Sequence, residues 1–566
     1  MDKLFFKITL CAAVAVSLVS CNDFLDKEVK GYATDKSFYD TQYKMQSALD
    51  AAYDVLQSDA YNDQEWRFGE GMSDNVFDRD EGTSTQMGQL VNFIFNTSNT
   101  WILQRWNVNY KGIHSANQVI YNIDRVKIST DSYSQYQDIR NIYGQAKFLR
   151  AFYYFNLVKS FGGVPIRPEQ ESADSLVMPR SSKEACYAYI ENDLREAAVM
   201  LPSSYFGTSN LGKATRGVAV ALLMKVLMYE ATNGVKSDKW QQVVELGKYM
   251  VDGDPITYRE MLRWNGNDEE WETLRERLWF KPRNLITTAT EYESPDDELS
   301  NISKNYSLGY LDYYGNVLHG GDKWAYCFQF YSDGEFCKSS VFEVVFKESA
   351  DGSSGDNNEG FGLEFFDVGQ LKMYTMDELL SNIFVTGDAR RDFVIHHQTT
   401  TFDGQNWQGG EGMVVSLKWY TPLKDKPKFA GDNGKNRRVM RYPEVVLTYA
   451  EALNECGESQ EALEKLNMCK AQVNSINNST VLYQPGGYGF MRDQIWRERR
   501  AEMAFEWDRY FDLVRTGQAA SVMHAFGNRR TNRRGAYFRE RVHELLPIPQ
   551  TEVDVSNGVV VQNPGY

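Results

Sequence analysis

Apolar residues recur at three- and four-residue spacing through most of the first half of the chain. This is the period of an amphipathic helix, and it predicts helices over residues 37–56, 101–126, 138–161, 182–200, 215–232 and 239–251. After the third of these, Gly162 allows the chain to leave the helix, and Pro165 prevents the helix from resuming. Ser182 is the expected N-cap of the next helix. The same spacing returns near the C-terminus and predicts helices over residues 442–455, 460–473 and 488–515, with Pro443 in a first turn.

The periodicity changes between residues 257 and 432. Helical spacing fades there, Gly, Asn and Asp become frequent, and the alternating run at residues 341–346 predicts a strand. Paired helices with small residues at close-packing positions are typical of tetratricopeptide-like hairpins. The pattern therefore predicts a mainly α protein: a helical hairpin scaffold at residues 21–256 and 433–566, with an inserted loop-rich mixed α/β subdomain at residues 257–432.

The N-terminus has the pattern of a bacterial lipoprotein signal. Basic Lys3 and Lys7 precede an apolar stretch at residues 8–19, and the sequence Leu-Val-Ser-Cys ends at Cys21. The stretch is shorter than the roughly 20 apolar residues that span a bilayer. We therefore expect residues 1–20 to be a signal peptide and Cys21 to carry the lipid that tethers the protein to a membrane.

Composition narrows the class of ligand. The formal net charge of −16 argues against nucleic acid, because nucleic-acid binding requires clustered Lys and Arg. After Cys11 and Cys21, five cysteines remain without a C-x-x-C pair, which argues against zinc. Of these, Cys327 and Cys337 are spaced to form one disulfide across a hairpin, which sequence alone does not decide. The aromatic content of 14%, with 34 Tyr and 12 Trp, exceeds what core packing needs and suggests a binding surface.

Five blocks in order along the chain resemble one protein family. They are CNDFLD at residues 21–26, AKFLRAFYYFNLVKSFGGVPI at 146–166, RYPEVVLTYAEALNE at 441–455, RERRAEMAFEWDRYFDLVR at 497–515, and LLPIPQ at 545–550 with a terminal QNPGY at 562–566. Together they resemble the SusD/RagB family of outer-membrane nutrient-binding lipoproteins. The resemblance implies four tetratricopeptide-like units, a lipid-anchored position on the cell surface and capture of oligosaccharide for import. It also implies a SusC-like TonB-dependent transporter as partner, over which the protein acts as a hinged lid.

Two stretches supply residues suited to a sugar ligand. A sugar ring stacks its apolar face on Trp or Tyr while polar side chains meet its hydroxyl groups. The first stretch lies where the resemblance implies part of a binding face, and its candidates are Trp66, Arg67, Asp74, Asn75 and Trp101. The second lies in Gly- and Asn-rich sequence, where exposed aromatic platforms occur, and its candidates are Tyr310, Tyr313, Tyr314 and Trp324.

Other functions stay open at this point. RagB-type relatives take peptides, so a peptide-binding importer component is a second hypothesis. A surface glycoside hydrolase ranks last, because the chain has no G-x-S-x-G elbow, P-loop or H-E-x-x-H motif, although paired carboxylates need no fixed spacing. We therefore assign no catalytic residue and no resident metal. Which glycan is bound is not encoded in any motif.

Two groups of acidic residues suggest calcium binding in one case and structural ion pairs in the other. Calcium needs oxygen ligands, which two loops supply: Asp74, Asp78, Asp80 and Glu81, and separately Asp351, Asp356, Asn357 and Glu359. Neither loop has the EF-hand spacing, and solvated turns are the commoner outcome. The charged block at residues 498–515 has helical spacing and predicts ion pairs within one helix and packing against the neighbouring hairpin.

Overall fold

The protein was analysed as a computed structural model, which describes residues 38–75, 77–78, 84–128, 133–172, 175–231, 237–281, 294–321, 324–348, 373–376, 383–394, 404, 413–414, 416–428, 433–528 and 537–566. The predicted signal peptide and Cys21 lie outside these residues. Helices dominate, so the prediction of a mainly α protein is confirmed. The helices are α4 (Gln42–Gln57), α5 (Asp59–Trp66), α6 (Gln86–Val91), α7 (Thr100–Asn122), α8 (Tyr133–Phe161), α9 (Lys183–Met200), α10 (Arg216–Ala231), α11 (Asp238–Gly247), α12 (Tyr258–Leu262), α13 (Asp268–Trp279), α15 (Ala325–Phe328), α18 (Arg391–Val394), α19 (Tyr442–Glu455), α20 (Ser459–Asn474), α21 (Tyr488–Met503), α22 (Arg509–Arg515), α23 (Ala519–Asn528) and α24 (Gln550–Val555). Two π-helical turns follow α5 and α11: η1 (Arg67–Gly71) and η4 (Lys248–Asp252).

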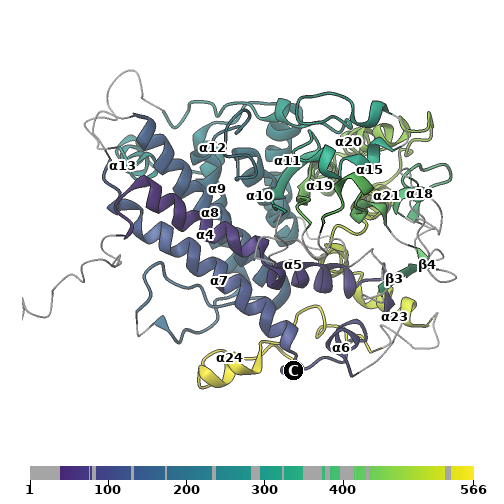
Figure 1. The fold of residues 1–566 in the computed structure, drawn as a ribbon, viewed down its shortest axis with the longest axis horizontal. Coiled ribbons are helices and arrows are strands. Elements are labelled where there is room, and N and C mark those ends of the chain that lie inside the picture. Colours follow the sequence, from purple (N-terminus) through teal and green to yellow (C-terminus); the bar gives the residue numbers. More distant parts are fainter. Residues whose placement is uncertain are drawn as a thin grey trace, which may run out of the picture.

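Consecutive helices pack against each other in pairs, as a hairpin scaffold requires. α7 packs on α8, α8 on α9, α9 on α10 and α10 on α11, and α4 lies against both α7 and α8 (Figure 1). In the C-terminal part α19 packs on α20 and α21, and α10 and α11 contact α19. The two helical regions of the sequence therefore form one continuous scaffold.

The central helix α8 is buried on almost every side. All of its residues from Tyr143 to Phe161 are buried, because α4, α7, α9 and α10 contact it. Its charged side chains are consequently paired: Arg150 Nε lies 2.7 Å and Lys147 Nζ 3.0 Å from the carboxylate of Asp193 on α9.

The predicted helix ends are confirmed at three positions. The hydroxyl of Ser182 accepts a hydrogen bond from the backbone N–H of Ala185, at 3.1 Å, and caps α9. Gly162 follows α8 with φ of +73°, a conformation that glycine adopts without a Cβ penalty. Pro443 lies in the first turn of α19, where a missing N–H costs no helical hydrogen bond.

The strands are short, and the paired strands are far apart in the sequence. β2 (Ser340–Val344) confirms the predicted strand, and it pairs antiparallel with β5 (Arg437–Arg441), immediately before α19. A second sheet has the order β1-β3-β4, formed by β1 (Phe77–Asp78), β3 (Met373–Met376) and β4 (Met413–Val414). The residues between 257 and 432 therefore join the rest of the chain through two strand pairings, of β2 with β5 and of β3 with β1.

The prediction of one helix over residues 488–515 is wrong. The helix breaks between α21 and α22, where Phe505 and Trp507 adopt left-handed backbone conformations with φ of +64° and +72°. Tertiary contacts stabilise the break: Trp507 stacks on Trp419 with ring centroids 4.5 Å apart, and the Trp419 indole N–H donates to the Phe505 carbonyl at 2.7 Å. Helical spacing alone does not reveal these contacts.

The charged block of α21 and α22 is structural, but most of its pairs cross between elements instead of running along one helix. The crossing pairs are Arg390–Glu498 (2.7 Å), Arg499–Glu444 (2.8 Å) and Arg515–Glu451 (2.8 Å). All six side chains are buried. Within α22, Arg515 also pairs with Asp512, which matches the predicted local spacing.

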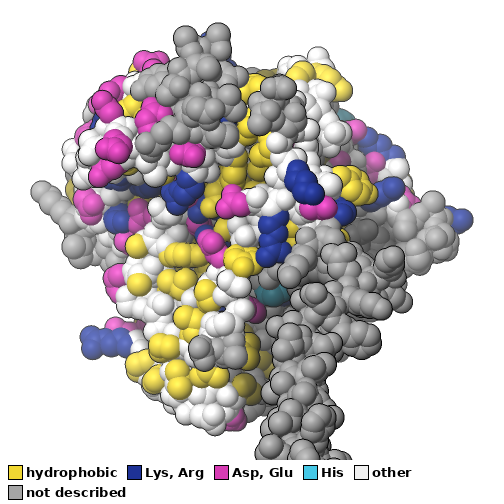
Figure 2. All heavy atoms as spheres, turned by 90° about the vertical axis from the view of Figure 1, so that its left-hand side faces the viewer, with side chains coloured by type: hydrophobic (Ala, Val, Ile, Leu, Met, Phe, Trp, Pro, Cys, Tyr) yellow, Lys and Arg dark blue, Asp and Glu magenta, His cyan; other side chains and the backbone are white. Residues whose placement is uncertain are grey.

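On the face drawn in Figure 2, hydrophobic, basic and acidic side chains are interspersed. In the part of the chain that the structure describes, no helix combines the length and the apolar character needed to cross a bilayer.

Candidate functional site

Three aromatic side chains, two exposed and one half-buried, meet where the loop after α9 contacts the loop at residues 306–318. Phe206 stacks on Tyr313 with ring centroids 4.7 Å apart, and Tyr314 stands nearly perpendicular to both, at 5.3 Å from Tyr313 and 6.4 Å from Phe206. The Tyr313 hydroxyl accepts a hydrogen bond from the Gly207 N–H at 3.0 Å, which ties the two loops together. Phe206 is 56% and Tyr314 77% exposed. We call Phe206, Tyr313 and Tyr314 the aromatic platform.

A tight turn presents the two tyrosines. Gly315 has φ of +92°, and the carboxylate of Asp312 accepts a hydrogen bond from the Asn316 N–H at 2.7 Å. This side chain-to-backbone bond is typical of Asp in turns. Tyr313 and Tyr314 therefore lie at the tip of the turn, where few other elements can bury them.

A cavity of about 190 Å³ adjoins the platform. Phe206 and Tyr313 form part of its wall, and Lys338 Nζ lies 6.0 Å from the Phe206 ring centroid. Its polar lining includes Ser203, Ser204, Thr215, Asn305 and Ser340. The platform and cavity together offer flat apolar faces beside hydroxyl, amide and ammonium groups, the combination that suits a ligand with an apolar face and a polar rim.

Arg67 and Trp101 from the first predicted stretch also meet. The Arg67 guanidinium carbon lies 3.9 Å from the Trp101 ring centroid, a cation–π stack, and both side chains are half-buried. Trp101 occupies the first turn of α7, which Asn99 caps by accepting hydrogen bonds from the N–H groups of Trp101 and Ile102. This pair is a smaller surface feature, separate from the platform in its contacts.

Burial removes Trp66 and Tyr310 from the solvent-facing candidates. Trp66 is 1% exposed and Tyr310 9% exposed, and both belong to a second hydrophobic core with Tyr326. Trp324 packs against the edge of that core, with its ring centroid 5.3 Å from that of Phe393, and is half-buried. Of these three, only Trp324 has ring surface to offer a ligand in this structure.

Asp74 and Asn75 are buried and engaged with the protein itself. Burial opposes ionisation of Asp74, but Arg500 and Arg509, at 2.7 and 2.8 Å, outweigh it and lower the pKa of the carboxyl to about 2. Asn75 donates a hydrogen bond to Glu70 at 2.7 Å and accepts one from Arg500 at 3.1 Å. These contacts connect the segment after η1 to α21 and α22.

The sequence analysis missed Phe206. The signal that singled out Tyr313 was present: aromatic residues in a Ser-, Gly- and Asn-rich loop, here residues 202–215. The loop lies in the helical first half of the chain, and only the folded structure brings it against Tyr313.

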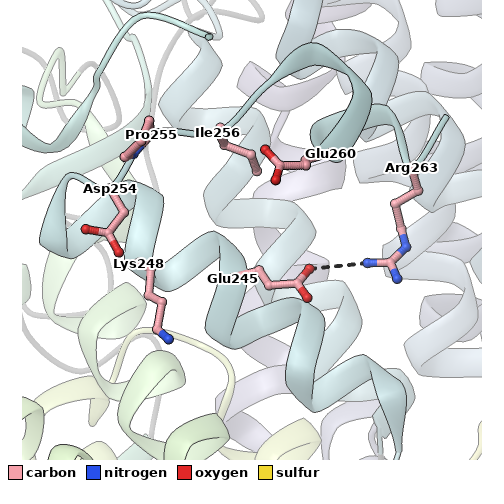
Figure 3. A pocket seen from close by; sticks show the side chains of 7 residues that line it. All are labelled: Glu245, Lys248, Asp254, Pro255, Ile256, Glu260 and Arg263. Atoms are coloured by element: carbon pink, nitrogen blue, oxygen red, sulfur yellow. Dashed lines mark hydrogen bonds and ion pairs between the residues drawn. The ribbon is translucent and has the colours of Figure 1, made fainter. Parts of the chain in front are cut away.

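A second cavity, of about 510 Å³, lies between α11, η4 and α12 (Figure 3). Charged groups dominate its wall, and Glu245 and Arg263 form an ion pair at 3.3 Å on one side of it. Glu260 is already engaged in the capping box of α12 with Thr257. The cavity is lined by no aromatic ring among the described residues, so it is less suited to stacking than the platform.

The structure tests part of the candidate calcium loops and the candidate disulfide. Asp74 pairs with two arginines, whereas Asp80, Glu81 and the whole second acidic loop lie outside the described residues. Across the described ranges, no three His, Cys, Asp or Glu side chains group closely enough to hold a metal ion. Cys327 and Cys337 are buried free thiols. The hairpin disulfide does not form in this structure.

Family models match both ends of the chain. The SusD family model matches residues 381–566, and a model described as starch-binding, associating with outer membrane, matches residues 23–228. Together these matches cover more than half of the sequence. SusD-like proteins of Formosa agariphila and Bacteroides ovatus are 24% and 23% identical over 92% and 90% of this chain, and over 93% and 82% of their own lengths.

Solved structures share the fold from end to end. A SusD homolog from Bacteroides thetaiotaomicron has a TM-score of 0.69 at 20% identity and covers 96% of this chain and 100% of its own. Surface glycan-binding protein A from the same organism, solved in complex with laminarihexaose, has a TM-score of 0.65 at 21% identity, with coverages of 92% and 99%. The blocks at both ends of the sequence, the helical hairpin scaffold and these matches agree: the chain belongs to the SusD-like family.

Proposed function

We propose that this chain is a surface lipoprotein that binds oligosaccharides on the aromatic platform and delivers them to a SusC-like TonB-dependent transporter, acting as its lid. The observation that carries the proposal is the contact of exposed Phe206 and Tyr314 with half-buried Tyr313, beside a polar-walled cavity. Stacking supplies the apolar contact, and the hydroxyl, amide and ammonium groups of the wall meet the sugar hydroxyls. The chain binds and does not cleave its ligand.

Support also comes from relatives of the same fold. One is named a laminarin-binding SusD-like protein, and another is a surface glycan-binding protein solved with laminarihexaose. In this chain we assign secondary ligand contacts to Arg67, Trp101 and Trp324, which are half-buried. The buried residues Trp66, Asp74, Asn75 and Tyr310 are not assigned as ligand contacts. Lipid on Cys21 would anchor the protein to the outer membrane.

The first experiment is affinity electrophoresis of residues 22–566 through gels that contain laminarin and a panel of other neutral and acidic polysaccharides. We expect one polymer to retard the protein without release of reducing sugar. Tyr313→Ala and Phe206→Ala should each abolish retardation and leave the melting temperature nearly unchanged. Tyr43→Ala is the matched control, because Tyr43 is 81% exposed and lies in the first turn of α4.

Three outcomes would overturn parts of the proposal. Retardation that survives both platform variants would move the site elsewhere, with Trp101→Ala and Trp324→Ala as the next variants. Release of reducing sugar would identify an enzyme. Free migration through every gel would favour a peptide ligand, whose binding through charge and backbone hydrogen bonds should weaken with salt.

The transporter partnership needs its own test. We expect the full-length protein, extracted from outer membranes in mild detergent, to co-purify with a TonB-dependent barrel in a stable ratio. Recovery of the lipoprotein alone under conditions that preserve barrel complexes would contradict the lid role.

A further inference from the structure

Arg437, the first residue of β5, is a buried cation that forms no ion pair among the described residues. Its side chain is 3% exposed, and its Nε and Nη1 have no hydrogen-bond acceptor among the described residues. In the same part of the chain, no carboxylate forms an ion pair with it within 4.0 Å. Its guanidinium carbon lies 4.9 Å from the Trp507 ring centroid and 5.4 Å from that of Tyr61, so its near neighbours are aromatic faces.

Arg437 lines a small cavity inside the scaffold. The cavity is about 40 Å³ and is bounded by α8, α10, β5 and the segment between α21 and α22. Its wall carries four cations, Lys159, Lys225, Arg437 and Arg438, against three carboxylates, Glu65, Glu506 and Asp508. About 10–15 Å³ of cavity volume in this measure holds one water molecule, so the cavity has room for one atom-sized ion or about three waters.

The three carboxylates are already shared between cations. Each one faces two basic side chains, and the pairs are Glu65 with Arg105 (2.9 Å) and Lys159 (3.9 Å), Asp508 with Lys159 (3.4 Å) and Lys225, and Glu506 with Lys418 (2.6 Å) and Arg441 (2.6 Å). Lys225 also pairs with Glu444 (2.9 Å), and Arg438 pairs with Glu343 (3.4 Å). Arg437 is therefore the one cation of the wall that forms no ion pair among the described residues, in a protein whose formal net charge is −16.

The buried charge of Arg437 favours binding of an anion in this cavity. An uncompensated charge in a protein interior carries a desolvation cost of several kcal/mol, which a nearby opposite charge offsets. Burial also lowers the pKa of Lys159 in spite of Asp508 and Glu65, and the nearby cations Arg105 and Lys225 act in the same direction as burial. Unsatisfied buried polar groups in native proteins commonly mark a bound water or ion.

We propose that this cavity binds a small monovalent anion of the halide class, held by the Arg437 guanidinium and attracted by Lys159 and Lys225. The volume favours a single-atom anion over sulfate or phosphate. Because its walls come from the N-terminal helices, β5 and residues 506–508, the anion links the two helical regions of the scaffold. This site is independent of the proposed glycan platform, and its test does not require a sugar ligand.

The direct test is crystallography of residues 22–566 grown in sodium bromide, with data collected at the bromine absorption edge. We expect an anomalous peak within hydrogen-bond distance of the Arg437 guanidinium. Water density without anomalous signal at that position, or bromide at surface positions only, would overturn the proposal.

Thermal unfolding provides the solution test. At equal ionic strength, we expect the wild-type melting temperature to be higher in sodium bromide than in sodium gluconate, whose anion is too large for the cavity. Arg437→Gln should lose this difference. Arg263→Gln, which changes a half-exposed arginine of the second cavity, should keep it. Equal melting temperatures of the wild-type protein in the two salts would contradict the inference, whatever the stability of the Arg437 variant.

Discussion

The central helix α8 and the segment at residues 306–331 are both rich in aromatic side chains, yet they place them differently. On α8, Phe148 and Tyr153 are completely buried, because helices surround α8. In the segment, Tyr314 is 77% exposed, while Tyr326, twelve residues later, is 0% exposed. Aromatic density therefore does not locate a binding surface. Whether an aromatic side chain is exposed depends on how many other elements of the structure pack against it.

Charged side chains show the same contrast between buried and exposed positions. Arg390 has no exposed surface and contacts the carboxylates of Asp388, Glu498 and Glu502 at 2.7 to 2.9 Å. Lys424, by contrast, pairs with Asp333 where both side chains are about half exposed. The first kind of pair specifies how α21 packs, whereas water screens the second kind.

The largest effect is expected from Arg390→Ala. It leaves three buried carboxylates with one cation fewer and should lower the free energy of unfolding by about 3–5 kcal/mol. Guanidinium unfolding monitored by circular dichroism measures the loss. Lys424→Ala is the control and should cost less than about 1 kcal/mol. Similar losses in the two variants would remove the distinction between buried and exposed pairs.

Two substitutions of Tyr326 measure separately how packing and hydrogen bonding contribute to the stability of the second core. Its side chain is fully buried, and its hydroxyl has no hydrogen-bond partner among the described residues. Tyr326→Ala should cost about 3 kcal/mol through lost packing, while Tyr326→Phe should be neutral or stabilising because it removes a buried unsatisfied group. Urea unfolding of both variants tests this. A large loss in Tyr326→Phe would show that the hydroxyl is in fact bonded.

Glu70 predicts a pH dependence of stability. Burial raises the pKa of this carboxyl to about 7, although hydrogen bonds from Asn75 and the Phe505 N–H, together with nearby Arg509, act to lower it. The folded state therefore binds the proton more tightly than the unfolded state does, where the pKa is about 4.5. The stability contribution falls as pH rises from about 4.5 to about 7 and is constant above that range.

Glu70→Gln should remove this dependence. The variant should match the wild type near pH 4 and exceed it by up to about 3 kcal/mol at pH 8, because its side chain stays neutral. Denaturant unfolding at the two pH values measures the difference. A wild-type advantage at pH 8 would mean that the ionised carboxylate is stabilised by the surrounding arginines.

The smallest stability effect is expected at the platform. Tyr314→Ala should change the free energy of unfolding by less than about 0.5 kcal/mol, since most of its ring is already in water. Its effect on glycan retardation should nevertheless be large. A destabilised Tyr314→Ala protein would indicate that the tyrosine holds its loop and does not serve as a binding surface.

Much of the scaffold was predictable because its signals are local. The helical period, the Ser182 cap and the turn at Gly162 depend on residues close together in the sequence, and each is found in the structure. The break between α21 and α22 was not predictable, since Trp419, from a distant stretch of sequence, stabilises it by stacking on Trp507. The site was likewise predictable only in part. The composition of their loop predicted Tyr313 and Tyr314 as candidates, whereas Phe206 comes into contact with them only in the folded structure.

By itself, the sequence determined that the chain is a mainly helical hairpin protein with the ordered blocks of the SusD-like family, because periodicity, caps and motif order are properties of neighbouring residues. Only the tertiary structure decided which aromatic residues face water, which carboxylates Arg390 and Arg499 meet, and that Arg437 meets none within the described residues. Burial and charge pairing depend on elements far apart in sequence, so no local pattern specifies them.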